Sequence, residues 1–247
     1  MYDYYLGGLH NFTADRRMAQ EAIRMWPELP QIMQANRAFL RRAVRYIVGQ
    51  GVTQILDIGS GIPTVGNSHE VAQQADPHAR VAYVDADPVA VAHSRAILAD
   101  NANTVVLQAD LREPELILAD PEVNRIIDFD RPVVVLLIAV LHFMKDEDDP
   151  AGVIAALRNA LAPGSYLAIS HASPEGQDDR AANHQKLYSM TPTPMTMRSQ
   201  SEIREFFAGF DLVEPGLVRM PAWRPDLPYD VDEPNRVPGF AGVGRRR

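Results

Sequence analysis

The stretch that most constrains this chain is a short apolar strand that runs directly into a glycine turn. Residues Gln54 to Ile58 read as a buried strand, and Gly59-Ser60-Gly61 follows without an intervening residue. Glycine lacks a Cβ atom, so the backbone can bend sharply there and a ligand can approach it closely. This pattern is typical of open α/β sheets, in which ligands lie beyond the carboxyl ends of parallel strands.

The rest of the chain alternates strands with helices. The apolar run Val133 to Leu141 contains no polar residue, as expected of a central parallel strand buried on both faces. Further strands are predicted at 80–84, 104–108, 166–170, 211–220 and 240–243, and helices at 36–48, at 87–98 and after Asp149-Pro150. The sequence therefore predicts a Rossmann-like α/β fold, with a mostly parallel seven-stranded sheet and helices on both faces.

Charge and composition narrow the class of partner. The formal net charge of −8 disfavours nucleic acid, because phosphate binding needs a basic surface. The longest apolar run is far shorter than the roughly 20 residues of a membrane helix, and no signal peptide is evident. The chain has no cysteine, which excludes disulfides and thiolate metal sites. We therefore expect a cytoplasmic protein with no membrane or nucleic-acid partner.

Two features near the glycine turn indicate which ligand it suits. A dinucleotide fingerprint needs Gly or Ala three positions after Gly61, and Thr64 occupies that position. Asp57 lies two residues before the first glycine, where a negative charge suits an ammonium or N–H group better than a pyrophosphate. Both features favour S-adenosylmethionine over a nicotinamide dinucleotide.

Acidic residues also follow the next two strands. Asp85 ends the second strand, where an acid can accept hydrogen bonds from both ribose hydroxyls, unless it serves only to shape a turn. Asp110 follows the third strand and can accept a hydrogen bond from an exocyclic amine such as that of adenine. With the glycine turn, these acids predict a nucleoside site.

These motifs resemble those of class I S-adenosylmethionine-dependent methyltransferases, over about residues 54–170. Over nearly the whole chain, the sequence also resembles the actinobacterial S-adenosyl methyltransferase family, formerly a domain of unknown function. The motifs that carry the two resemblances include Tyr2–Gly8, Asn36–Leu40, Leu56–Thr64, Tyr83–Pro88, Ala109–Pro114, Val140–Phe143 and Leu212–Gly216.

The resemblance implies a set of cofactor-binding residues. It places Gly59, Ser60 and Gly61 on the methionine part of S-adenosylmethionine, Asp85 on the ribose, Asp110 with Leu111 at the adenine, and Ala139 and Val140 near the cofactor at the end of the fourth strand. The aspartate or asparagine that some amine methylators carry at that strand end is absent. Methylation of an exocyclic base amine is therefore disfavoured.

The catalytic residues are not evident from sequence, because methyl transfer needs alignment more than it needs a base. His142 and His171 follow the fourth and fifth strands, where either could deprotonate a hydroxyl group. Hydrogen bonds to nearby backbone groups are the alternative role for each. No histidines show the spacing of metal ligands, so no metal is expected.

The N-terminal segment Tyr4 to Phe12 is aromatic and contains two glycines, which is unusual for a free end. It could form a lid over the cofactor, with Tyr5 and Asn11 contributing, or a strap packed on the sheet. Methionines and prolines at 188–197 suit an adaptable wall for a small acceptor, or simply a core.

We expect one domain over residues 1–247, made of an N-terminal cap or strap (1–35), a cofactor-binding core (36–171) and a C-terminal part with acceptor-side loops (172–247). The predicted activity is methyl transfer from S-adenosylmethionine to a small-molecule acceptor. The alternatives are a regulatory protein that binds S-adenosylmethionine without catalysis and, less favoured, an NAD-dependent oxidoreductase.

Overall fold

The computed structural model describes residues 2–8, 11–63, 66–176, 185, 188, 194–226 and 237–247. Its strands are β1 (Gln54–Ile58), β2 (Arg80–Asp85), β3 (Thr104–Gln108), β4 (Val134–Ile138), β5 (Tyr166–His171), β6 (Phe210–Leu212), β7 (Val218–Arg219) and β8 (Phe240–Arg246). Its helices are α1 (Tyr2–Tyr5), α2 (Thr13–Met25), α3 (Leu29–Gly49), α4 (Ser68–Ala75), α5 (Pro88–Ile97), α6 (Pro114–Ala119), α7 (Pro121–Ile126), α8 (Pro150–Ala160) and α10 (Gln200–Glu205). Three 3-10 turns are η1 (Leu141–Phe143), η2 (Asp146–Asp148) and η3 (Met220–Ala222).

Within the described residues, a single sheet holds eight strands in the order β3-β2-β1-β4-β5-β8-β6, with β7 paired to β8. Strands β1 to β5 run parallel, and β8 lies antiparallel between β5 and β6. The strand order reverses between β1 and β4, which is where open α/β sheets bind ligands. The predicted Rossmann-like, mostly parallel sheet is confirmed.

The predicted count of seven strands is wrong. The segment 211–220, expected to be one strand, forms β6 and β7 with a turn between them. In this turn the N–H of Gly216 donates to the carbonyl of Val213 at 2.8 Å. Gly216 has a φ of +91°, which a strand cannot accommodate.

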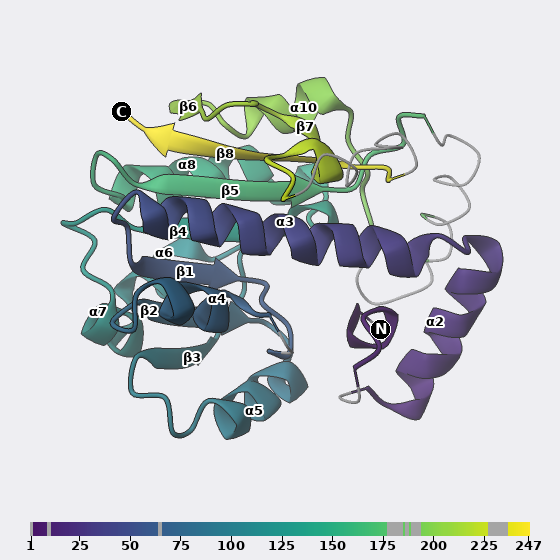
Figure 1. The fold of residues 1–247 in the computed structure, drawn as a ribbon, viewed down its shortest axis with the longest axis horizontal. Helices are drawn as coiled ribbons and strands as arrows, with labels where there is room; N and C mark the ends of the chain where they lie inside the picture. The colour runs from purple at the N-terminus through teal and green to yellow at the C-terminus, as the bar shows by residue number, and fades with distance from the viewer. Residues whose placement is uncertain are drawn as a thin grey trace.

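Each face of the sheet buries its own apolar core. Side chains alternate along the strands, so that Ile55 of β1 faces α3 and α4 while Leu56 faces the opposite side. Helices α6, α7, α8 and α10 cover that second face. The site therefore depends on the ends of strands that are fixed from both sides (Figure 1).

Three helices begin at side chains that cap their first turn. Asp87 accepts a hydrogen bond from the N–H of Val89 at 2.9 Å and starts α5, and Asp149 caps α8 through the N–H of Gly152 at 3.0 Å. Ser199 forms a capping box with Glu202 at the start of α10. Each satisfies a main-chain N–H that the first helical turn leaves without a partner.

Helix α3 is longer than predicted, because it begins at Leu29 rather than at Asn36. The buried guanidinium of Arg42 donates to the carbonyls of Trp223 and Met220, each at 2.8 Å, and so ties α3 to η3. Figure 1 shows the N-terminal end of α3, together with α1 and α2, beyond the carboxyl ends of the parallel strands. This arrangement carries the N-terminal segment to the edge where the predicted site lies.

Candidate functional site

The glycine turn after β1 has one packed side and one open side. Gly59 and Gly61 have φ values of +73° and +62°, in the left-handed region. A Cβ atom on Gly59 would lie 2.3 Å from Cγ2 of Val140, whereas one on Gly61 would have no heavy atom within 4 Å. The N–H groups of Gly59 and Ser60 donate to the carbonyl of Val84, at 2.8 and 3.2 Å. The turn is thus held against β2 and β4 with open space above Gly61.

Asp85, the last residue of β2, lies against this turn. Its carboxylate accepts from the N–H of Gly61 at 2.7 Å and from the N–H of Asp87 at 2.9 Å. Burial raises the pKa of Asp85, and these hydrogen bonds partly oppose that effect. A carboxylate has roughly four acceptor positions, so Asp85 retains capacity for further donors such as a pair of hydroxyls.

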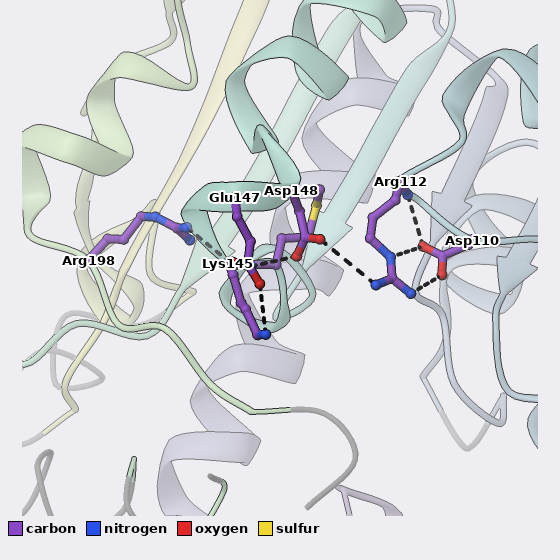
Figure 2. Close-up of polar contacts among 7 residues, drawn as sticks. Asp110, Arg112, Lys145, Glu147, Asp148 and Arg198 are labelled. Atoms are coloured by element: carbon purple, nitrogen blue, oxygen red, sulfur yellow. Dashed lines mark hydrogen bonds and ion pairs between the residues drawn. The ribbon is translucent and has the colours of Figure 1, made fainter.

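Asp110 and Leu111 follow β3. Leu111 is buried in the apolar core, while the carboxylate of Asp110 reaches the surface and is held by Arg112. Figure 2 shows this contact, in which Nε and Nη2 of Arg112 donate to the two carboxylate oxygens at 3.0 and 2.5 Å. The guanidinium lowers the pKa of Asp110, so the carboxylate is ionised and acts only as an acceptor.

The chain leaves β4 through Ala139, whose φ of +57° is unusual for a residue other than glycine. Its N–H donates to both the carbonyl and the hydroxyl oxygen of Ser170, at 3.1 and 3.0 Å. The Ser170 hydroxyl in turn donates to Oδ1 of Asn36 on α3, at 2.5 Å. This bend brings Val140 against Gly59, so the ends of β1 and β4 are fixed relative to one another.

A chain of buried polar groups lies below the glycine turn, and sequence reasoning missed all of it except Asp57. Ser68 donates to the carboxylate of Asp57 at 2.7 Å, and the Ser68 and Tyr83 hydroxyls lie 2.9 Å apart. The Tyr83 hydroxyl also lies 2.7 Å from Nδ1 of His69. The Ser68 hydroxyl has a single proton, which it donates to Asp57. The Tyr83 hydroxyl therefore donates to Ser68, and Nδ1 of His69 donates to the Tyr83 hydroxyl. The polar chain runs from a half-buried imidazole to a fully buried carboxylate.

Burial also governs the ionisation of Asp57. It raises the pKa of this carboxyl to about 6, against the opposing effects of the Ser68 hydrogen bond and the positive charge of Arg37. Arg37 itself donates to Oδ1 of Asn67 on the segment that leads into α4. The one sequence signal for Arg37 is its place in the shared motif Asn36–Leu40.

The N-terminal segment, Tyr4 to Phe12, makes its contacts near the carboxyl ends of the parallel strands. Tyr5 is buried beside Tyr188, and burial raises the pKa of its phenol. Asn11 donates to Oδ2 of Asp3 at 2.7 Å and to the carbonyl of Gly8 at 2.8 Å, so its amide closes the N-terminal turn. Direct contact of Tyr5 and Asn11 with the cofactor stays a prediction.

The aromatic ring of Phe12 reaches across to helix α5. It meets the ring of His93 edge-on, with 6.0 Å between ring centroids. The N-terminal segment also packs on α3 through α1. Its described residues therefore contact both α3 and α5.

Of the two candidate bases, His171 is committed to structural hydrogen bonds. Its Nδ1 lies 2.7 Å from the carbonyl of Ala172, which can only accept, so this nitrogen carries the proton. Nε2 then accepts from Nη1 of Arg198 at 3.2 Å. Burial lowers the pKa of His171 to about 4, and the ring is neutral. This geometry disfavours His171 as a general base.

His142 is also buried, and its ring centroid lies 5.5 Å from that of His171. Its Nδ1 accepts from the N–H of Ala172 at 3.4 Å, a long hydrogen bond. The polypeptide carbonyl of His142 accepts from Thr196, which brings the segment after Pro194 to the end of β4. A catalytic role for His142 stays a prediction.

Half of the predicted acceptor wall at 188–197, residues 189–193, lies outside the described part of the chain. Tyr188 packs against Phe143 with 5.9 Å between ring centroids, and Met195 is buried. The described ranges contain no group of three His, Asp or Glu side chains suited to a metal ion. Nor do they include a helix with the length and apolar character needed to cross a membrane.

Comparison with known proteins identifies the family. Residues 1–247 match the family described as S-adenosyl methyltransferase. The chain belongs to this family. It is an S-adenosylmethionine-dependent methyltransferase, which excludes the alternative of a nicotinamide oxidoreductase.

Solved structures agree with the family assignment. A protein of Thermobifida fusca YX, described as a candidate methyltransferase, is 43% identical over 100% of this chain and 93% of its own, with a TM-score of 0.94. A DUF574 family protein of Streptomyces avermitilis MA-4680 is 38% identical over 100% and 95% of the two chains, with a TM-score of 0.95. No curated protein matches the methyltransferase.

A more distant structure shares the fold alone. The N-methyltransferase NodS of Bradyrhizobium japonicum WM9, in complex with S-adenosyl-L-homocysteine, is 14% identical over 93% of this chain and 98% of its own. Its TM-score is 0.53.

Proposed function

We propose that this protein transfers the methyl group of S-adenosylmethionine to a small organic acceptor. The cofactor would lie across the carboxyl ends of β1, β2 and β3. In this arrangement the glycine turn, Gly59, Ser60 and Gly61, would line the methionine part of the cofactor. Asp85 would accept hydrogen bonds from the ribose hydroxyls, and Asp110 with Leu111 would hold the adenine. Ala139 and Val140 would flank the reacting end. The open space above Gly61, with Asp85 beside it, supports this placement.

The position of the N-terminal segment carries the proposal of a small acceptor. Helices α1 and α2 lie beyond the carboxyl ends of the strands (Figure 1), and the ring of Phe12 contacts that of His93 on α5. A segment in this position acts as a lid, which restricts access by a macromolecule more than access by a small molecule. The net charge of −8 also disfavours nucleic acid. A cytoplasmic location and the division into cap, core and C-terminal part stay predictions.

The protein residues promote methyl transfer by aligning the cofactor with the acceptor. S-adenosylmethionine supplies an electrophilic methyl group, and displacement requires the acceptor atom in line with it. The rigid ends of β1 and β4, joined by the contact of Gly59 with Val140, would fix the cofactor side of that line. Where the acceptor needs deprotonation, the geometry disfavours His171, whose two ring nitrogens are already engaged.

Calorimetric titration with S-adenosylmethionine tests the cofactor site. Replacing Asp85 with Asn should weaken binding by about tenfold or more, because hydrogen bonds from two ribose hydroxyls to a carboxylate are lost. Asp87→Asn is the matched control, since it changes a neighbouring carboxylate that caps α5. Equal affinity of Asp85→Asn and the wild type would exclude the proposed ribose site.

The acceptor class is tested by incubating the protein with S-adenosylmethionine and fractionated cell extract, and by measuring S-adenosylhomocysteine. Product should form with the low-molecular-weight fraction. Turnover that depends only on the protein or nucleic-acid fraction would contradict the proposal. No turnover with any fraction would favour a regulatory, non-catalytic role.

The lid is tested separately by deleting residues 1–12 and by the milder variant Phe12→Ala. Phe12 is 53% exposed, so its replacement should leave stability nearly unchanged. Both variants should release S-adenosylhomocysteine several-fold faster than the wild type in stopped-flow fluorescence. Unchanged affinity and release would show that the segment is only a strap.

A further inference from the structure

Arg112 is a residue of the shared motif Ala109–Pro114 to which the proposed reaction assigns no role. Its guanidinium takes both oxygens of the Asp110 carboxylate, while its main-chain N–H donates to Oδ1 of the same carboxylate at 2.9 Å. Three donors from a single residue therefore fix the plane of this carboxylate. Figure 2 shows the pair, which lies on the loop between β3 and α6.

A second carboxylate, that of Asp148, also contacts the guanidinium of Arg112. Nη1 of Arg112 lies 3.9 Å from Oδ1 of Asp148, which belongs to η2 on the loop after β4. Asp148 is itself fixed, because its Oδ2 accepts from the N–H of Lys145 at 2.8 Å. Arg112 thus bridges the loops that follow β3 and β4, with its guanidinium between the carboxylates of Asp110 and Asp148 (Figure 2).

Stability does not account for this arrangement. The side chains of Arg112 and Asp110 are 57% and 29% exposed, and exposed ion pairs contribute little to folding. The main-chain N–H of Arg112 already closes the turn at Asp110 without the guanidinium. What the guanidinium adds is the orientation of the carboxylate.

An oriented, ionised carboxylate can distinguish between purine bases. The paired Asp110 offers only acceptor positions, which suit the 6-amino group of adenine. A 6-oxo group presents an acceptor at the same place, so a carboxylate repels it. A site with a fixed polar group rejects the wrong partner strongly, because its own group is left without a hydrogen bond.

We propose that Arg112 is a positioning residue, which orients Asp110 so that this carboxylate selects a 6-aminopurine over a 6-oxopurine in the bound cofactor. This inference rests on the proposed function, which places the adenine at Asp110. Asp148 supports Arg112 from the loop after β4.

The test compares the binding of S-adenosylhomocysteine with that of S-inosylhomocysteine, which differs only in carrying a 6-oxo base. Isothermal titration is made with the wild type, Arg112→Gln, Arg112→Lys, Asp148→Asn and the control Arg125→Gln. Arg125 is matched to Arg112, being an exposed arginine paired with a nearby carboxylate, that of Glu122. Because the Arg112 pair is exposed, all variants should melt within about 4 °C of the wild type.

We expect the wild type to prefer the adenine compound by at least about tenfold, as for one charged hydrogen bond. Arg112→Gln should reduce this preference to less than about threefold, mainly by weakening the adenine compound. Arg112→Lys should restore part of the preference, Asp148→Asn should lower it slightly, and Arg125→Gln should keep it. A purely structural role for Arg112 would weaken both ligands equally.

Two results would overturn the inference while leaving the proposed function intact. One is a wild type that binds both ligands equally, and the other is an Arg112→Gln variant that keeps the wild-type preference. If the wild type binds neither compound, the proposed cofactor site itself is wrong and the inference is overturned with it.

Discussion

At the scale of single residues, Asp57 shows how burial changes the behaviour of an ordinary carboxyl group. Its pKa is raised from 3.8 to about 6, chiefly by desolvation. Between about pH 4 and 6 the folded protein therefore binds more protons at this residue than the unfolded chain does. Stability contributed by the protonated form falls as pH rises through this window and stays lower above it.

Comparison of the wild type with Asp57→Asn isolates this effect. The free energy of unfolding of the wild type, relative to the variant, should fall by at most about 3 kcal/mol between pH 4 and 7, since each pKa unit corresponds to about 1.4 kcal/mol. Denaturant unfolding at a series of pH values measures it. Parallel pH profiles for the two proteins would show that the Asp57 carboxyl has the same pKa folded and unfolded.

Arg198 is a buried cation whose role is structural. Its guanidinium, 5% exposed, donates to the carbonyls of Leu141 and Met144, to His171 and to Asp146. Arg198→Met should lower the free energy of unfolding by about 2–4 kcal/mol, because buried acceptors lose their donor. Arg204→Met, on the exposed face of α10, is the control and should change stability little. Comparable losses in both variants would contradict this role.

At the scale of elements, the two glycines of the turn after β1 meet different requirements. Gly59 is required for packing against Val140, and Gly61 for binding of the cofactor. Gly59→Ala should lower the free energy of unfolding by about 2–4 kcal/mol, from its left-handed φ and the overlap with Val140. Gly61→Ala should cost only about 1 kcal/mol, because no heavy atom lies near its added Cβ.

The order of the two variants should be reversed in the affinity of the folded protein for the cofactor, with Gly61→Ala more affected than Gly59→Ala. Gly61→Ala places a methyl group in the space proposed for S-adenosylmethionine and should weaken its binding more than tenfold by calorimetry. The double variant Gly59→Ala with Val140→Ala should recover part of the lost stability. A Gly61→Ala protein that binds normally would place the cofactor elsewhere.

The order of strands and helices along the chain was largely predictable, whereas the elements that pack against each of them were not. Strands β1 and β3 have the predicted bounds, because apolar runs and turn residues mark them in the sequence. The helix α4 was missed, since Ser68–Ala75 is short and mostly polar, with two buried apolar residues, Val71 and Ala72. The break between β6 and β7 was missed because the residues on both sides of it suit a strand.

At the scale of the whole molecule, β8 unites the C-terminal part with the core. It pairs with β5, β6 and β7, so most of its backbone donors and acceptors are engaged in the sheet. Truncation after Gly239 should prevent folding, because it leaves three strands without their shared neighbour. Removing only Arg247, an exposed residue paired with Asp211, should leave stability within about 1 kcal/mol of the wild type.

Circular dichroism and size-exclusion chromatography of the two truncated proteins check this prediction. A cooperative thermal transition in the protein that ends at Gly239 would show that residues 1–239 fold on their own. In the intact protein, amide hydrogen exchange in β8 should be as slow as in β5, since both should open only on global unfolding.

The sequence alone determined the alternation of strands and helices, the glycine turn and the acids at the strand ends, because these depend on residues close together in the chain. Only the tertiary structure decided which side chains meet. It engaged both nitrogens of His171, linked Asp57 to His69 through two hydroxyls, and placed Arg112 between Asp110 and Asp148. Most of these contacts join residues from separate elements, and no local pattern records such a distance in space.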